Sequence, residues 1–182
     1  QMFAARYFKY KEPHSIITSG GLGTMGFGLG AAIGAKVGNP DKAVIHITGD
    51  GSFRMNCNEL AVEQHYDIPV ITFVFNNHTL GMVRQWQNLI YQKRFSQTTL
   101  DRGPDFVKLA EGFGGTGYRA TTPEEFEEKI DNWLKAFDES EHKMLLSLLS
   151  QFYYYSEEKV KENSKKLYQK FLFHAYNHTD YL

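Results

Sequence analysis

Two short apolar runs dominate the hydrophobic pattern, and a polar cluster follows each of them directly. Ala43–Thr48 and Val70–Phe75 are rich in β-branched and aromatic residues, which predicts two strands. Gly49-Asp50-Gly51-Ser52 follows the first run and Asn76-Asn77 follows the second. Between them, the apolar spacing of Asn56–Tyr66 predicts a helix. A strand, a helix and a strand of this length form a parallel crossover, so both polar clusters should lie at the same sheet edge, where ligands bind.

The rest of the chain alternates helical and short apolar segments, which indicates an α/β fold. Helical spacing covers residues 1–12, 29–37, 104–111 and 122–137, and short strands are expected at 16–18 and 118–120. Thr122 and Glu125 have the spacing of a capping box, and so do Asn56 and Glu59. Residues 143–149 are a further strand candidate. We expect one domain over residues 1–150 and a divergent or unrelated helical tail over 151–182.

Composition excludes several classes of protein. The hydrophobic share is 42% and the charged share 23%, as in a globular domain with a core. A net charge of −1 gives no electrostatic case for binding nucleic acid or anionic membranes. No apolar run approaches membrane-spanning length, and the start of the chain lacks the apolar region of a signal peptide. The single cysteine, Cys57, permits no disulfide within the chain and is expected to be inert and half-buried.

The polar clusters at the strand ends offer oxygen ligands. Asp50 supplies a carboxylate, Asn77 supplies an amide carbonyl, and the neighbouring glycines permit close approach to the backbone. Few oxygen ligands with room for phosphate oxygens suit Mg²⁺ bound together with a diphosphate. The glycine run from Gly20 to Gly30 is either a tight cofactor-binding turn or a flexible loop. His46 alternates with apolar strand residues, which favours a packed polar residue over a metal ligand.

These motifs resemble those of thiamine-diphosphate (ThDP) enzymes. The segments Ser19–Leu29, Gly49–Phe53 and Gly81–Gln87 are similar to the catalytic subunit of acetolactate synthase. The resemblance covers about residues 1–137 and corresponds to the C-terminal third of such an enzyme. It implies a mostly parallel sheet flanked by helices on both faces, the diphosphate-binding domain of ThDP enzymes.

The resemblance also implies roles for individual residues. Asp50, Asn77 and the main-chain carbonyl of Thr79 are expected to hold Mg²⁺. Met25 is expected to bend ThDP, and the alternative is a core filler. Trp86 is expected to shape the substrate pocket with Met82 and Val83, and the alternative is a core aromatic residue. The full set of expected cofactor contacts is Gly23, Met25, Gly49, Asp50, Gly51, Ser52, Asn77, Thr79, Gly81 and Met82.

The activity implied is the condensation of two pyruvates, or of pyruvate and 2-ketobutyrate, with loss of CO₂ in branched-chain amino acid biosynthesis. The resemblance implies a full-length enzyme that is a homodimer or tetramer, in some members with a regulatory small subunit, and that carries FAD mostly in a middle domain. It acts in the cytoplasm, or in the plastid of a plant. Its catalytic glutamate comes from a partner subunit's N-terminal domain, so no catalytic residue is expected here. The alternatives are an inactive, truncated ThDP-binding module and another 2-keto-acid ThDP enzyme, such as a pyruvate oxidase or glyoxylate carboligase.

Overall fold

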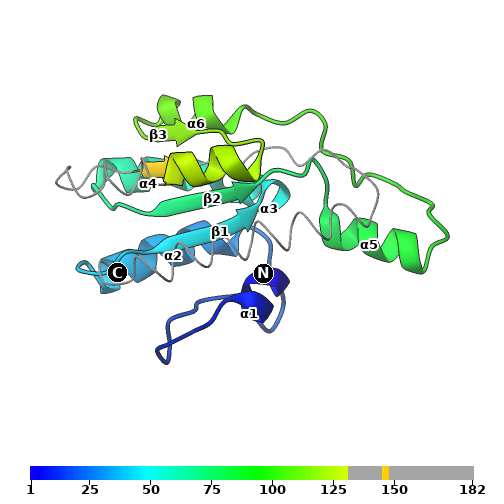
Figure 1. Cartoon of the computed structure of the whole chain (residues 1–182), viewed down its shortest axis with the longest axis horizontal. Helices are drawn as coiled ribbons and strands as arrows, with labels where there is room; N and C mark the ends of the chain where they lie inside the picture. The colour runs from blue at the N-terminus through cyan, green and yellow to red at the C-terminus, as the bar shows by residue number, and fades with distance from the viewer. Residues whose placement is uncertain (131–144, 148–182) are drawn as a thin grey trace.

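The fold is built around two neighbouring parallel strands. The computed structural model describes residues 1–130 and 145–147 (Figure 1). Strand β1, Ile45–Gly49, pairs in parallel with β2, Ile71–Phe75, and Gly49 lies opposite Phe75 in the register. The two strands therefore end at the same edge, as the sequence predicts. Each begins one or two residues later than the apolar pattern indicates.

Helices connect and cover these strands. They are α1 Met2–Tyr7, α2 Phe27–Gly38, α3 Asp50–Asn56, α4 Leu60–His65, α5 Gly81–Leu89 and α6 Phe106–Gly112, with a 3₁₀ turn at Cys57–Glu59 and further helix at 123–130. Figure 1 shows α5 lying apart from the strands, beyond their carboxyl ends. None of the helices in the described part of the chain is long and apolar enough to span a membrane.

A second parallel pair lies beside the first. Strand β3, Thr116–Tyr118, pairs with β4, Leu145–Ser147, and β4 also contacts β2. The strand expected within residues 143–149 is therefore confirmed for its central residues. The strand expected at 118–120 is shifted toward the N-terminus.

Two apolar clusters form the core, one on each face of β2. Alternate residues of a strand point to opposite faces, so Val70 and Val74 join one cluster while Ile71 and Phe73 join the other. The first cluster draws on α2, α3, α4 and α6, and the second includes Phe126 of the helix at 123–130. Helices thus cover both faces, which confirms the α/β fold with a parallel sheet between helices.

The sequence predicts that the helix between the two strands begins at Asn56, and this start is wrong. Helix α3 begins at Asp50, directly after β1, with extended Gly49 as its N-cap residue. The helical stretch then breaks at the 3₁₀ turn before α4. The expected Asn56–Glu59 capping box does not form, because the Asn56 side chain donates its hydrogen bond to the Gly26 carbonyl instead. A tertiary contact has replaced a local one.

Other boundaries also differ from the sequence predictions. Helix α1 ends at Tyr7 rather than at residue 12, and residues 16–18 form no strand. Helix α6 begins after Pro104, because the Asp105 carboxylate accepts hydrogen bonds from the Val107 and Lys108 N–H groups and caps it. Helix α2 begins two residues earlier than expected.

The capping box at Thr122 is confirmed in its forward half. The Thr122 hydroxyl accepts from the Glu125 N–H at 3.2 Å, while the Glu125 carboxylate accepts from the N–H and hydroxyl of Thr121 at 2.7 Å. The predicted end of this helix at residue 137 and the tail helix lie outside the described residues.

Candidate functional site

Asp50 is the buried acidic residue at the shared strand edge. Only 2% of its surface is exposed, and it opens α3 immediately after β1. Burial raises the pKa of its carboxyl group, while a hydrogen bond from the Gly51 N–H and the charges of His78 and Arg54 oppose that rise. His78 belongs to the turn after β2, so the two strand ends interact electrostatically. A cation bound here would favour the ionised carboxylate, which fits the expected Mg²⁺ ligand.

Asn77 shapes the turn after β2. Its side-chain oxygen accepts a hydrogen bond from the Thr79 N–H at 3.0 Å, and His78 between them has a φ of 53°. An amide oxygen has two lone pairs, so Asn77 retains capacity for a cation. Next to it, a Cβ on Gly81 would lie 3.5 Å from the Asn77 side-chain nitrogen.

Thr79 is held in place by a distant segment that the sequence did not indicate. Its hydroxyl donates to the Thr98 carbonyl at 2.7 Å, and Thr79 forms an antiparallel bridge with Thr99. The flanking bonds run from Leu80 N–H to the Thr98 carbonyl and from Leu100 N–H to the His78 carbonyl. These hydrogen bonds join residues 78–80 to residues 98–100 and hold the Thr79 backbone in position.

The glycine-rich segment reaches the same edge. Gly23 and Gly26 have positive φ values of 60° and 82°. A Cβ on Gly51 would lie 3.5 Å from the Met25 Cε atom and 2.7 Å from a Leu80 methyl carbon, so both side chains pack closely against this glycine. Met25 is 39% exposed, and the alternative that it fills the core is therefore wrong. The flexible-loop alternative is wrong from Phe27 onward, where α2 begins.

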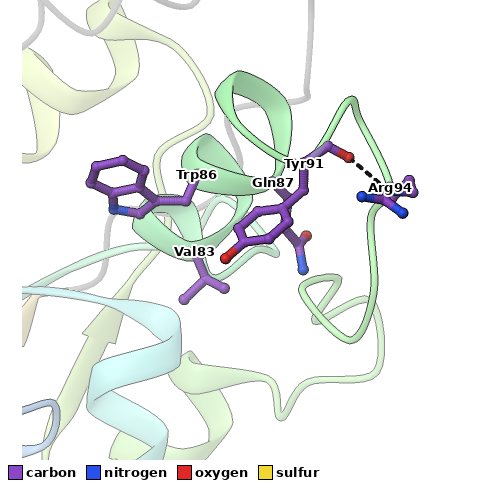
Figure 2. A pocket seen from close by; sticks show the side chains of 5 residues that line it. All are labelled: Val83, Trp86, Gln87, Tyr91 and Arg94. Atoms are coloured by element: carbon purple, nitrogen blue, oxygen red, sulfur yellow. Dashed lines mark hydrogen bonds between the residues drawn. The ribbon is translucent and has the colours of Figure 1, made fainter.

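The expected substrate-pocket residues lie on α5. Trp86 is 52% exposed, and none of the α5 residues is buried, so the core-aromatic alternative is wrong. Val83 and Trp86 line an open pocket of about 460 Å³ together with Gln87, Tyr91 and Arg94 (Figure 2). The Arg94 Nε donates to the Tyr91 carbonyl at 3.2 Å. An aromatic wall and a cationic side chain suit a small acid with an apolar part.

Gln87 connects this pocket to residues 96–98, at the end of the loop that is hydrogen-bonded to residues 78–80. Its amide nitrogen donates to the Ser96 carbonyl at 2.9 Å, and its oxygen accepts from the Thr98 hydroxyl at 3.1 Å. Thr98 is 2% exposed and in turn accepts from Thr79. Sequence reasoning missed these contacts because Gln87 and Thr98 lie in polar stretches without a distinctive pattern.

His46 is a packed polar residue and Cys57 is half-buried, as the sequence predicts. His46 is buried on β1, its Nδ1 lies 3.4 Å from the Thr72 hydroxyl oxygen, and burial lowers its pKa to about 4. Cys57 is a half-buried free thiol. In the described part of the chain, no three His, Cys, Asp or Glu side chains gather to hold a metal ion. The expected Mg²⁺ site has one carboxylate and would not form such a group.

Comparison with known proteins gives consistent matches. The profile of the thiamine pyrophosphate enzyme C-terminal TPP binding domain matches residues 1–146. The chain is 57% identical over 130 residues to the probable acetolactate synthase large subunit of Methanocaldococcus jannaschii, which covers 71% of this chain and 22% of that protein. It is 48% identical over 135 residues to the acetolactate synthase isozyme 3 large subunit of Escherichia coli, covering 74% of this chain and 24% of that protein.

A solved structure shares the fold. It is the thiamine diphosphate-dependent 4-hydroxybenzoylformate decarboxylase of Rhodococcus jostii RHA1, with a TM-score of 0.57 and 31% sequence identity. The match covers 73% of this chain and 24% of that one. The chain thus spans about a quarter of the length of the proteins it matches.

Proposed function

Because the chain belongs to the thiamine pyrophosphate enzymes, as their C-terminal TPP-binding domain, we propose that it is the ThDP- and Mg²⁺-binding domain of an acetolactate synthase large subunit. One observation carries the proposal. Strands β1 and β2 are parallel and end opposite each other, at Gly49 and Phe75. Asp50 and the turn at Asn77 therefore both leave the sheet at the same edge. Identities of 46–57% to named acetolactate synthase large subunits support the choice of reaction.

The residues at this edge fit the expected cofactor. Asp50, the Asn77 side chain and the Thr79 carbonyl would hold Mg²⁺, and the Ser52 hydroxyl, which accepts from the Gly26 N–H, would donate to the diphosphate. When bound, ThDP supplies the carbanion chemistry that removes CO₂ from one 2-keto acid and joins the remainder to another. Met25, half-exposed beside Gly51, is placed to support a bent cofactor.

The helix α5 supplies the substrate side. Trp86 and Val83 present an apolar wall to the pocket, and Arg94 lies at its rim. We assign no catalytic residue to this chain, because the glutamate implied by the resemblance belongs to another domain. The proposed substrates are 2-keto acids, and the proposed pathway is branched-chain amino acid biosynthesis, in the cytoplasm or, for a plant protein, in a plastid. The proposed full-length enzyme is a homo-oligomer with a possible regulatory subunit. Its middle domain holds FAD.

Calorimetric titration with ThDP tests the cofactor assignment. Wild-type protein should bind ThDP only when Mg²⁺ is present, and Asp50→Asn should weaken binding at least tenfold because a neutral amide is a poorer Mg²⁺ ligand. Asp41→Asn, in the exposed turn before β1, is the matched control and should bind as wild type does. Equal affinity with and without Mg²⁺, or in Asp50→Asn, would refute the metal site.

A chimera tests the reaction. Residues 1–130 would replace the matching segment of the E. coli isozyme 3 large subunit, to which the chain is 48% identical. The chimera should form acetolactate from pyruvate, and the same chimera with Asp50→Asn should not. A chimera that binds ThDP and Mg²⁺ but forms a different product from pyruvate would favour another 2-keto-acid ThDP enzyme, the class to which the R. jostii decarboxylase belongs. Binding without turnover would favour the inactive module.

A further inference from the structure

Helix α3 holds the peptide groups of Gly26 from two sides. The Gly26 N–H donates to the Ser52 hydroxyl oxygen at 2.9 Å, and the Asn56 side-chain nitrogen donates to the Gly26 carbonyl at 3.1 Å. Ser52 and Asn56 are four positions apart, so both side chains lie on the same face of α3. We call this pair of bonds the Gly26 clamp.

The backbone held by the clamp has an unusual conformation. Gly26 has a φ of 82°, is buried, and is the N-cap residue of α2 without a side chain to cap it. A Cβ at this position would lie 3.2 Å from the Met55 Cβ and 3.4 Å from the Asn56 Cγ. A side chain at position 26 would be strained by this φ and crowded against α3, so the backbone held by the clamp is suited to glycine.

The clamp connects two parts of the candidate site. Met25 directly precedes Gly26, and its Cε lies near Gly51 in the first turn of α3. Asp50 opens the same helix. One short rigid element therefore carries the predicted metal ligand at its start and fixes the backbone beside Met25 at its end.

We propose that Asn56 is a positioning residue, which sets the place of Met25 relative to Asp50 through the Gly26 clamp. The inference rests on the proposed function, in which Met25 supports the organic part of ThDP. Ser52 completes the clamp but keeps its hydroxyl proton free to donate to a diphosphate oxygen. Loss of the Asn56 bond therefore loosens Met25 and leaves the diphosphate and metal contacts intact.

The binding test compares two probes on Asn56→Ala. Loss of one hydrogen bond should weaken binding of ThDP with Mg²⁺ by about fivefold to tenfold. Binding of inorganic pyrophosphate with Mg²⁺ should stay unchanged, since that probe has no ring to rest on Met25. Asn58→Ala is the matched control, because the exposed Asn58 side chain donates to the neighbouring Glu59 carboxylate at 3.1 Å and its loss should alter neither affinity. Equal weakening for both probes, or none for ThDP, would overturn the proposal.

A second measurement needs no ligand. In protein labelled with ¹³C at the methionine methyl groups, the Met25 signal is assigned with Met25→Leu and followed in Asn56→Ala and in the isosteric Asn56→Asp. Both variants should shift the Met25 signal toward its unfolded position while the Met82 signal on α5 stays in place. An unmoved Met25 signal would refute the clamp. If wild-type protein bound no ThDP, the proposed function would fail, whereas the methyl signal would still decide whether Asn56 positions Met25. Thermal unfolding identifies any variant that fails to fold, and Asn56→Asp then serves in place of Asn56→Ala.

Discussion

Replacing Glu63 with glutamine should stabilise the fold, and the gain should grow as the pH rises. Glu63 lies on α4 with none of its surface exposed, and neither carboxyl oxygen has a hydrogen-bond partner among the described residues. Burial raises the pKa of this carboxyl group from 4.5 to about 8. The folded chain therefore keeps a proton that the unfolded chain releases.

The size of the effect follows from that pKa difference. The stability contributed by the protonated carboxyl is fully present below pH 4.5 and is lost as the pH rises to about 8. Each pKa unit corresponds to about 1.4 kcal/mol. Relative to low pH, the wild type should have lost about 3 kcal/mol at pH 7 and about 5 kcal/mol above the folded pKa. Glutamine has no titrating proton, so Glu63→Gln should not show this loss.

Urea unfolding followed by circular dichroism checks this prediction from about pH 5 to about pH 8.5. The difference in free energy of unfolding between Glu63→Gln and wild type should widen steadily with pH. Titration of His46, whose pKa burial lowers to about 4, affects both proteins equally and cancels in the difference. Glu111→Gln, at an exposed position of α6, controls for the substitution itself. Parallel stability curves for Glu63→Gln and wild type would show that Glu63 is charged in the fold.

Three further predictions follow. Gly28→Ala should destabilise the fold by about 1–3 kcal/mol, because the added methyl group would meet the buried His46 ring; urea unfolding measures it, and an unchanged midpoint would show that α2 moves away freely. The chain by itself should release no CO₂ from pyruvate with ThDP and Mg²⁺ added; release by protein free of host enzyme would mean that it contains its own catalytic acid. The isolated chain should self-associate through α5, where Trp86 and its apolar neighbours are about half exposed and the net charge is only −1. Light scattering across a concentration series tests this, and a monomer at every concentration that binds no hydrophobic dye would contradict it.

The strand pair was predictable because its signals are local and strong. Val70–Phe75 is apolar except for Thr72, and the polar turn that follows leaves little freedom in where β2 ends. The Thr122 cap was predictable for the same reason, since its partner lies three residues away. A ligand edge between parallel strands then follows from topology alone.

Tertiary contacts account for what the sequence did not predict. Asn56 has the residue type of a helix cap, but its partner is Gly26, thirty positions away, so local reasoning placed the helix start too late. The Thr79–Thr98 bond joins two polar stretches without periodicity. Glutamate is a residue type that ordinarily faces solvent, and only the packed structure shows that Glu63 is buried.

Residues 78–80 are hydrogen-bonded to residues 98–100. These bonds hold the ends of the intervening segment in place, whatever the sequence of its middle part. The chain leaves the edge where β1 and β2 end at Leu80 and returns at Thr98, and the intervening α5 and its loop carry the pocket. Lengthening a loop whose ends are already joined costs little, about 0.6 kcal/mol for each doubling. Under the proposed function, insertions or substitutions at residues 90–95, beyond α5, would therefore change which substrate the pocket accepts without disturbing the strand ends. If the proposed function holds, substrate range can in this way diversify through the loop after α5 while the residues that hold the cofactor stay the same.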